Sequence, residues 1–408
     1  MAPAHPHAWR EERNKNNGTC RCRRSLGDSD GGSKRNTMKR IILSGGGTGG
    51  HIYPAVAVAE ALRRRFGEEV ELLFVGAEGK MEMEKVPALG YRIVGLPIAG
   101  LQRRLEWRNL LVPFKVLRSI RQARNVIRSF GADVVVGFGG YASAPVLWAA
   151  QRMGVPTVIQ EQNSYAGVTN KILARGACRI CTAYEGMERF FPKEKIVLTG
   201  NPLRGRFSKS GTPRAEALDY FGFTPGRKVV LVVGGSLGTR SLNEMMKTWL
   251  LSLGGGEAPV QVIWQTGKYY SEHIAAELAR RGKPANLYVT DFIADMGAAY
   301  RAADLVISRA GAGSISELCL VGKPAILVPS PNVAEDHQTK NAMALVAKDA
   351  AICVSDAQAP ATVIATALET VADNERMALL AANIRRLAMP DAADTIAREV
   401  VRLARQGR

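Results

Sequence analysis

The stretch at residues 39–54, KRIILSGGGTGGHIYP, constrains the fold of this chain most strongly. It reads as a short buried strand, a loop with five glycines and one threonine, and then His51 and the start of a helix. Glycine has no Cβ, so such a loop turns sharply and lets a ligand approach the main chain. The helix that follows directs free N–H groups and its positive dipole end at the same place. The stretch therefore predicts a site for an anion, above all a phosphate.

Length and composition indicate a globular protein with two domains. The 408 residues exceed what one ordinary core holds, since domains usually have about 100 to 200 residues. The content of 46% apolar and 23% charged residues is typical of soluble proteins. The nearest candidate for a membrane span, residues 142–159, is interrupted by Gln151 and Arg152. We therefore expect a chain that does not cross a membrane.

The formal net charge of +18 suggests an anionic partner. A nucleic-acid-binding module is one interpretation, but aromatic residues make up only 6% of the chain and no basic run alternates with them. A basic surface suits anionic lipids or pyrophosphate substrates equally well. The charge alone leaves these alternatives open.

Short apolar segments alternate with helical stretches from residue 39 onward. Alternation of this kind implies parallel strands with crossover helices, and hence doubly wound α/β sheets. The first series has expected strands at 39–44, 70–75, 133–136 and 157–160 and helices at 53–66, 109–129 and 142–153. The second series has expected strands at 228–233, 261–266, 286–290, 305–308 and 325–328.

The same pattern predicts the domain boundaries. Residues 1–37 have too few apolar side chains to form a core, so we expect a disordered N-terminal extension. A first Rossmann-like domain is expected at 38–200, a linker rich in Gly and Pro at 201–227, and a second Rossmann-like domain at 228–390. A last helix within 391–408 has apolar residues at helical spacing, and we expect it to return to the first domain.

Each half of the chain begins with a strand and a glycine turn, GGGTGG at 45 and GGSLG at 234. Ligands of open α/β sheets bind beyond the carboxyl ends of the strands, so we expect the site in a cleft between the domains. Gly45, Gly47 and Gly50 also satisfy the dinucleotide pattern GxGxxG, but Glu78 follows the second strand too late to hold a ribose. A nicotinamide cofactor remains an alternative with little support.

His51 has two interpretations. It is either a structural residue whose ring bonds a carbonyl of the loop, or a general base kept neutral by the helix N-terminus. Similarly, Ser314 and Glu317 of the stretch RAGAGSISE fit a capping box, but the same helix N-terminus suits a diphosphate, with Glu317 accepting from ribose hydroxyls. The polar segments at 160–170 and 330–341 are candidates for sugar contacts, above all Asn163.

The segment at 101–128 has eight Lys and Arg residues against one Glu. The default interpretation is a helix with a solvated basic face. Apolar residues lie among these cations, however, and this combination is typical of a patch that contacts an anionic membrane. The candidate patch consists of Trp107, Leu110, Leu111, Phe114, Arg118 and Arg121.

Eight motifs in this order, GGGTGGHIYPAVAVAEAL, GFGGYASAP, QEQNSYAGVTNKILA, GNPLR, GGSLG, DFIADM, RAGAGSISE and EDHQTKNA, resemble the MurG family. These are the peripheral membrane N-acetylglucosaminyltransferases of bacterial peptidoglycan synthesis. The likeness extends from about residue 38 to the C-terminus. It implies a GT-B fold, in which two Rossmann-like domains face a cleft.

The resemblance also implies the reaction. N-acetylglucosamine moves from UDP-GlcNAc to the C4 hydroxyl of MurNAc in lipid I, undecaprenyl-pyrophosphoryl-MurNAc-pentapeptide, and gives lipid II with inversion. The implied location is the cytoplasmic face of the bacterial cell membrane, with anionic lipids and proteins of cell-wall synthesis and division as further partners and no nucleic acid. A UDP-GlcNAc epimerase shares the GT-B fold and remains the nearest enzyme alternative.

Residue roles follow from the resemblance motif by motif. His51 matches the proposed base. The substrate-binding positions are Thr48, Gly49, Gly50, Asn163, Arg204, Ser236, Ile293, Ala312, Gly313, Ser314, Ile315, Ser316, Glu317 and Gln338. Among them, Asn163 and Gln338 face the donor sugar, Ile293 meets uracil through its main chain, and the run from 312 to 317 holds diphosphate and ribose. We expect no cofactor and no obligatory metal, because helix dipoles, N–H groups and Arg204 suffice for the leaving diphosphate and the folded region has no DxD.

Overall fold

The computed structural model describes residues 38–98, 112–204, 213–254 and 256–406. These residues form two parallel sheets, one with seven strands in the order β3-β2-β1-β4-β5-β6-β7 and one with six in the order β10-β9-β8-β11-β12-β13. The first sheet consists of β1 (Lys39–Ser44), β2 (Val70–Ala77), β3 (Ile93–Leu96), β4 (Val134–Gly137), β5 (Thr157–Glu161), β6 (Arg179–Thr182) and β7 (Ile196–Leu198). The second consists of β8 (Val229–Val233), β9 (Gln261–Gln265), β10 (Leu287–Thr290), β11 (Leu305–Ser308), β12 (Ala325–Leu327) and β13 (Ile352–Cys353). All neighbouring strands pair in parallel, which confirms the predicted α/β class.

All nine strands expected from the sequence are present, and four were missed. The missed strands β3, β6, β7 and β13 have two to four residues each and lie toward the outer parts of the sheets. Three of them, β3, β7 and β13, are half-buried or exposed for most of their length. These segments are apolar but only two to four residues long, too short for their pattern alone to indicate a strand.

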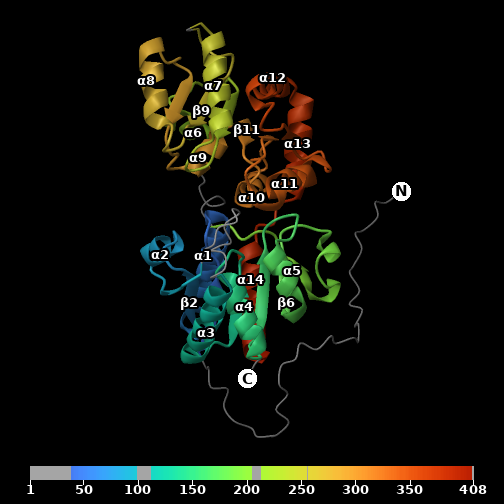
Figure 1. Cartoon of the computed structure of the whole chain (residues 1–408). Coiled ribbons are helices and arrows are strands. Elements are labelled where there is room, and N and C mark those ends of the chain that lie inside the picture. Colours follow the sequence, from blue (N-terminus) through green and yellow to red (C-terminus); the bar gives the residue numbers. More distant parts are fainter. Residues whose placement is uncertain (1–37, 99–111, 205–212, 255, 407–408) are drawn as a thin grey trace, which may run out of the picture.

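Helices cover both faces of each sheet (Figure 1). In the first half they are α1 (Gly49–Phe66), α2 (Glu82–Lys85), α3 (Val112–Phe130), α4 (Ser143–Arg152) and α5 (Val168–Leu173). The second half has α6 (Arg214–Tyr220), α7 (Arg240–Ser252), α8 (Ser271–Arg281), α9 (Met296–Ala302), α10 (Ala312–Val321), α11 (His337–Val346), α12 (Ala359–Ala372), α13 (Asn374–Arg386) and α14 (Ala392–Gln406). Helix α1 begins at Gly49, four residues before the expected start, so His51 lies in its first turn.

The last helix, α14, packs in the core of the first domain although it follows the second along the chain (Figure 1). Ile396 and Val400 are fully buried among residues of β1 and α1. Asp394 accepts hydrogen bonds from Arg64 at 2.7 Å and pairs with Arg65 at 3.0 Å on α1. The chain therefore crosses between the domains twice.

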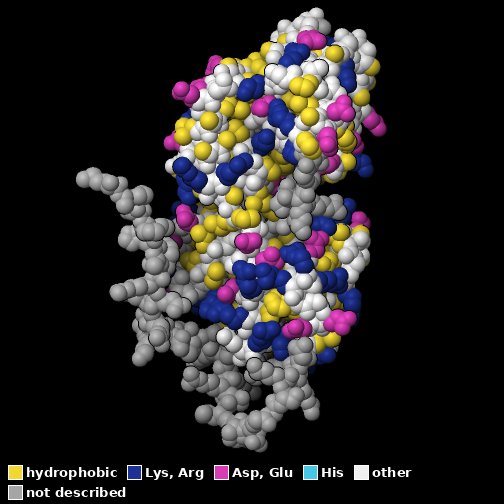
Figure 2. Space-filling model, turned by 180° about the vertical axis from the view of Figure 1, so that it is seen from behind, with side chains coloured by type: hydrophobic (Ala, Val, Ile, Leu, Met, Phe, Trp, Pro, Cys, Tyr) yellow, Lys and Arg dark blue, Asp and Glu magenta, His cyan; other side chains and the backbone are white. Residues whose placement is uncertain are grey.

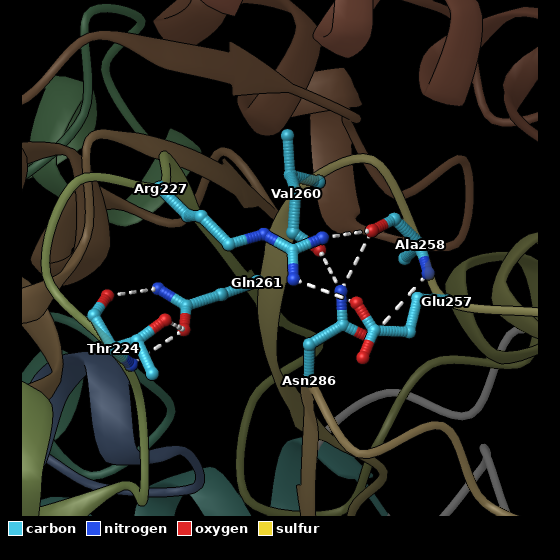
Figure 3. A network of polar contacts seen from close by, with 7 residues as sticks. All are labelled: Thr224, Arg227, Glu257, Ala258, Val260, Gln261 and Asn286. Carbon is cyan, nitrogen blue, oxygen red and sulfur yellow. Dashed lines mark hydrogen bonds and ion pairs between the residues drawn. The ribbon is translucent and has the colours of Figure 1, made fainter.

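A polar network fixes the amino edge of the second sheet, where β8, β9 and β10 begin (Figure 3). The Asn286 amide donates to the carbonyls of Ala258 at 2.7 Å and Val260 at 2.9 Å. Gln261 accepts from the Thr224 N–H at 2.8 Å and donates to the Thr224 carbonyl at 3.0 Å. Because ligands of such sheets bind at the carboxyl edge, this network is structural.

Part of the predicted membrane patch lies outside the described residues, as does the expected extension at 1–37. This applies to Trp107, Leu110 and Leu111, and Phe114 lies on α3 with its side chain outside the description. Arg118 and Arg121 are exposed on α3. Figure 2 shows Lys and Arg side chains on the visible face of both domains. Within the described ranges, no helix is long and apolar enough to cross a membrane.

Candidate active site

The glycine loop between β1 and α1 positions His51. Thr48 is the N-cap residue of α1, with extended backbone angles, and the N–H of His51 donates to the Thr48 carbonyl at 3.1 Å. The His51 ring returns toward the loop, with Nδ1 at 3.1 Å from Thr48 Oγ1 and at 3.2 Å from the Gly46 carbonyl oxygen. A hydrogen on Nδ1 satisfies that carbonyl and leaves Nε2 as a proton acceptor.

The loop after β4 covers the other side of the His51 ring. A Cβ on Gly139 would lie 2.9 Å from both Nε2 and Cδ2 of the ring. Similarly, a Cβ on Gly140 would lie 2.2 Å from the Gly46 carbonyl oxygen. The two glycines of the GFGGY motif thus let the loops after β1 and β4 touch.

Burial lowers the pKa of His51 below its ordinary value of 6.5. Glu161 and Glu82 oppose this effect through their negative charge, whereas His337 of the second domain adds to it. The ring is therefore neutral near pH 7 and able to accept a proton, as the interpretation of His51 as a general base requires.

Glu161 organises the segment after β5. The residue is 2% exposed, and its carboxylate accepts from the Asn163 N–H at 3.1 Å, the Gly167 N–H at 3.1 Å and the Asn170 amide at 2.8 Å. The Asn163 side chain also donates to Glu161 at 3.3 Å. Hydrogen bonds to the buried Glu161 carboxylate therefore fix the loop that contains Asn163, as expected for a preorganised site.

In the second domain, the run from Ala312 to Glu317 forms the first six residues of α10. The capping-box interpretation of Ser314 and Glu317 is wrong, because Gly311 is the N-cap residue and no side chain caps the helix. The Tyr300 hydroxyl instead donates to Glu317 at 3.0 Å, and burial raises the pKa of Glu317 to about 7. The small residues around the N-terminus of α10 leave its first N–H groups accessible to an anion.

The other predicted substrate-binding residues are dispersed. Ser236 is exposed in the loop after β8, and Ile293 is 3% exposed after β10. Gln338, on the first turn of α11, accepts from the Ser330 N–H at 2.9 Å. Arg204 forms an ion pair with Glu60 at 2.8 Å. At a rise of 1.5 Å per residue, Glu60 lies roughly 16 Å along the α1 axis from the first residue of that helix. The structure thus places Arg204 beside α1, and its neighbour Leu203 lines a pocket together with Ile315 and Ser316 of α10.

Several contacts bring α11 to the loop after β5. Asn341 bonds both Asn163 and Ser164, and the Lys340 ammonium lies 3.3 Å from the centroid of the Tyr165 ring. The His337 ring is also close to Tyr165, with 6.4 Å between their centroids. Thus His51 and Asn163 of the first domain share one interdomain space with α11 of the second.

A groove of about 680 Å³ opens at the carboxyl edge of the second sheet. Its walls include Thr239, Arg309, Ser330 and Gln338. Arg309 pairs with Asp356 at 2.6 Å inside it. The groove contains Gln338 but none of residues 312–317, so it is adjacent to the predicted donor site and distinct from it.

Sequence reasoning missed two residues that shape this site. Glu82 is fully buried behind the glycine loop, although nothing in its charged segment MEMEK indicates burial. Tyr300 supports Glu317 from α9, and no local pattern indicates it. In contrast, Asn341 lies in the polar segment 330–341 that was proposed as functional.

Comparison with known proteins agrees with this geometry. The glycosyltransferase family 28 N-terminal domain matches residues 41–182, and the C-terminal domain of the same family matches residues 229–396. A relative in Bacteroides fragilis, the "UDP-N-acetylglucosamine--N-acetylmuramyl-(pentapeptide) pyrophosphoryl-undecaprenol N-acetylglucosamine transferase", is 56% identical over 367 residues, which cover 90% of this chain and 96% of the relative. The chain belongs to the MurG family of glycosyltransferases.

Solved structures place this family in the GT-B fold. The MurG of Acinetobacter baumannii is 30% identical, with a TM-score of 0.70 over 89% of this chain and 99% of that one. A UDP-N-acetylglucosamine 2-epimerase has a TM-score of 0.61 at 11% identity, over 90% of this chain and 95% of that one, a likeness of fold alone. Because the chain belongs to this family, it is a glycosyltransferase. The family favours this function over a protein that binds a nicotinamide cofactor, a UDP-GlcNAc epimerase or a nucleic-acid-binding module. The GT-B prediction is confirmed.

Proposed function

We propose that the protein transfers N-acetylglucosamine from UDP-GlcNAc to the C4 hydroxyl of MurNAc in lipid I and so forms lipid II. One observation carries the mechanism: the His51 ring lies at the cleft with Nδ1 against the Gly46 carbonyl, and Nε2 has no hydrogen-bond partner in the described part of the chain. Nε2 then accepts the C4 hydroxyl proton while the oxygen attacks the anomeric carbon. The bond from that carbon to UDP breaks in the same displacement, which inverts the configuration.

The leaving UDP gathers negative charge as the bond breaks. In the proposal, the α10 N–H groups at 312–314 and the positive end of its helix dipole face the diphosphate, and Glu317 accepts from the ribose hydroxyls. The Ile293 main chain meets uracil, and Asn163 and Gln338 contact the donor sugar. Ser236 and Arg204 complete the donor side, with Arg204 leaving Glu60 as the donor binds.

No obligatory divalent cation enters this proposal, since the N–H groups and dipole of α10 are themselves aimed at the diphosphate. Thr48, Gly49 and Gly50 of the glycine loop are assigned to the pyrophosphate of the acceptor. Full activity of protein treated with EDTA supports this part of the proposal. Loss of turnover in EDTA that Mg²⁺ restores would refute it.

The direct test mixes the purified protein with UDP-GlcNAc and a lipid I analogue and measures UDP release. His51→Ala is expected to lower kcat by about 10²-fold to 10⁴-fold, the usual contribution of a general base, with little change in UDP binding. His273→Ala is the matched control, because the His273 ring is exposed on α8 with a side-chain exposure of 71%. Turnover of His51→Ala near that of the control would reject the base role.

We also propose that the first domain contacts the cytoplasmic face of the bacterial cell membrane through the patch that includes Arg118 and Arg121, where the undecaprenyl acceptor resides. A nearby cation contributes about 1 kcal/mol of attraction to anionic lipids. The double variant Arg118→Glu/Arg121→Glu is expected to sediment less with anionic vesicles at low salt, whereas Arg280→Glu/Arg281→Glu on α8 serves as the control. Equal sedimentation of the two variants would contradict the patch.

A further inference from the structure

A buried carboxylate fixes the shape of the glycine loop. Glu82, the first residue of α2, is 0% exposed. Its Oε2 accepts from the Gly47 N–H at 3.0 Å, and its Oε1 accepts from the Ala77 N–H at 3.0 Å. A Cβ on Gly46 would lie 2.0 Å from Oε1, so the loop and the carboxylate fit only with glycine there.

The Gly47 N–H belongs to the same planar peptide unit as the Gly46 carbonyl. That carbonyl oxygen lies 3.2 Å from His51 Nδ1. A single peptide group therefore connects the Glu82 carboxylate on one side with the His51 imidazole on the other. The order of the contacts is carboxylate to N–H, then carbonyl to ring nitrogen.

We infer that Glu82 is a positioning residue that acts on His51 through the peptide between Gly46 and Gly47. The carboxylate orients this peptide so that its carbonyl accepts from Nδ1–H and Nε2 stays free to take the proton. It also stabilises the imidazolium that forms when Nε2 is protonated. This inference rests on the proposed role of His51 as the base.

Two physical effects support the coupling. Hydrogen bonds in series polarise one another, so a carboxylate on the N–H makes the carbonyl of that peptide a stronger acceptor. A negative charge near the ring also favours its protonated form. The groups that face His51 are Glu161 of β5 and Glu82 of α2, which raise its pKa, and His337 of α11, which lowers it along with burial. Removing the Glu82 charge should therefore lower the pKa of His51 further.

The test compares Glu82→Gln with Glu84→Gln. Glu84 is exposed on the same helix and has no part in the site. The chain contains five histidines, so His51 can be assigned by its absence in His51→Ala and titrated by NMR. In Glu82→Gln the His51 midpoint is expected to fall by at least about half a pH unit, a measurable fraction of the shifts that single charges cause. In the pH profile of kcat/KM, the midpoint on the acid side should also move to lower pH. The affinity for UDP should not change.

An activity loss in Glu82→Gln with an unmoved His51 midpoint and tautomer would mean that Glu82 only braces the loop, and would overturn the inference. A second measurement uses the wild-type protein in case the variant does not fold. The Gly47 amide resonance should follow the His51 titration, and an amide that does not respond would also overturn the coupling. Because these readouts do not depend on turnover, they remain decisive if His51→Ala stays active and the base role fails.

Discussion

The Asn341 side-chain amide donates a hydrogen bond to Asn163 Oδ1 at 3.1 Å and thereby joins the two domains. Asn341 Oδ1 accepts from the Ser164 N–H at 2.8 Å, and the whole residue is 0% exposed. A buried amide that satisfies both its oxygen and its nitrogen across a domain boundary holds one relative position of the domains. Asn163, the residue assigned to the donor sugar, is thus oriented by the opposite domain.

The first prediction concerns this contact. Asn341→Ala leaves the Ser164 N–H without its partner, which costs about 1 to 3 kcal/mol of the closed arrangement. We expect a larger radius of gyration by small-angle scattering in the absence of substrates and a higher KM for UDP-GlcNAc. Asn383→Ala, which removes a contact of α13 to Asp349 within one domain, is the control. Scattering curves that coincide for the two variants would show that Asn341 does not hold the domains.

The second prediction concerns pH. Burial raises the pKa of Glu317 from 4.5 to about 7. As pH falls through about 7 the carboxylate takes up a proton and loses an acceptor for the ribose hydroxyls, so the KM for UDP-GlcNAc should rise between about pH 8 and about pH 6. In Glu317→Gln the KM should be higher and no longer depend on pH in this range. A wild-type KM that is flat across the range would contradict the assignment of Glu317.

The raised pKa of Glu317 also has a consequence for stability. A carboxyl whose pKa is higher in the folded state favours the fold when protonated, and this contribution is lost as pH rises from about 4.5 to about 7. Glu317→Gln removes the ionisation, so above about pH 7 the variant should unfold at a higher temperature than the wild type. A lower Tm of the variant at that pH would mean that the buried charge is not costly.

The sequence was sufficient for the long strands and for the loops that follow them. β8 is a continuous apolar run and β1 contains one at residues 41–43, and each strand is followed by a glycine turn, so both the sheet and its carboxyl edge could be located. The His51 stretch and the α10 N-terminus were found for the same reason. The short strands β3 and β13 were missed because four and two residues are too few for a pattern that predicts a strand.

The partners of the site residues could not be predicted. Glu82 and Gly47 are 35 residues apart in the sequence, and Arg204 and Glu60 are 144 apart. The sequence around each residue does not indicate such a distant partner. The capping-box interpretation failed for a related reason. Ser314 and Glu317 have the right spacing, but the helix begins two residues before Ser314, and Glu317 turns to Tyr300 on α9.

The third prediction separates stability from activity. Asn286 is 6% exposed and bonds Ala258 and Val260 at the edge of the second sheet that lies away from the site (Figure 3). Asn286→Ala leaves the Val260 carbonyl without its donor, whereas the Ala258 carbonyl still accepts from Arg227 at 2.8 Å, and the variant should lower the free energy of unfolding by about 1 to 3 kcal/mol. The KM and kcat of the folded protein should not change. Asn374→Ala, at an exposed position, should stay within about 0.5 kcal/mol of the wild type in urea denaturation.

The fourth prediction tests the environment of His51 with a pair of glycines. Gly139 and Gly154 both have positive φ angles, +93° and +73°, so alanine at either position costs roughly 1 to 2 kcal/mol of backbone strain. A Cβ at Gly139 would lie 2.9 Å from His51 Nε2, whereas a Cβ at Gly154 would meet no atom within 4 Å. Gly139→Ala should therefore lose most of its kcat while Gly154→Ala keeps it, and thermal unfolding should show that both variants are destabilised, Gly139→Ala the more because it adds the contact with the ring to the backbone strain. If the two variants turn over equally fast, the ring position next to Gly139 does not matter for the reaction, and the placement of the base at this loop fails.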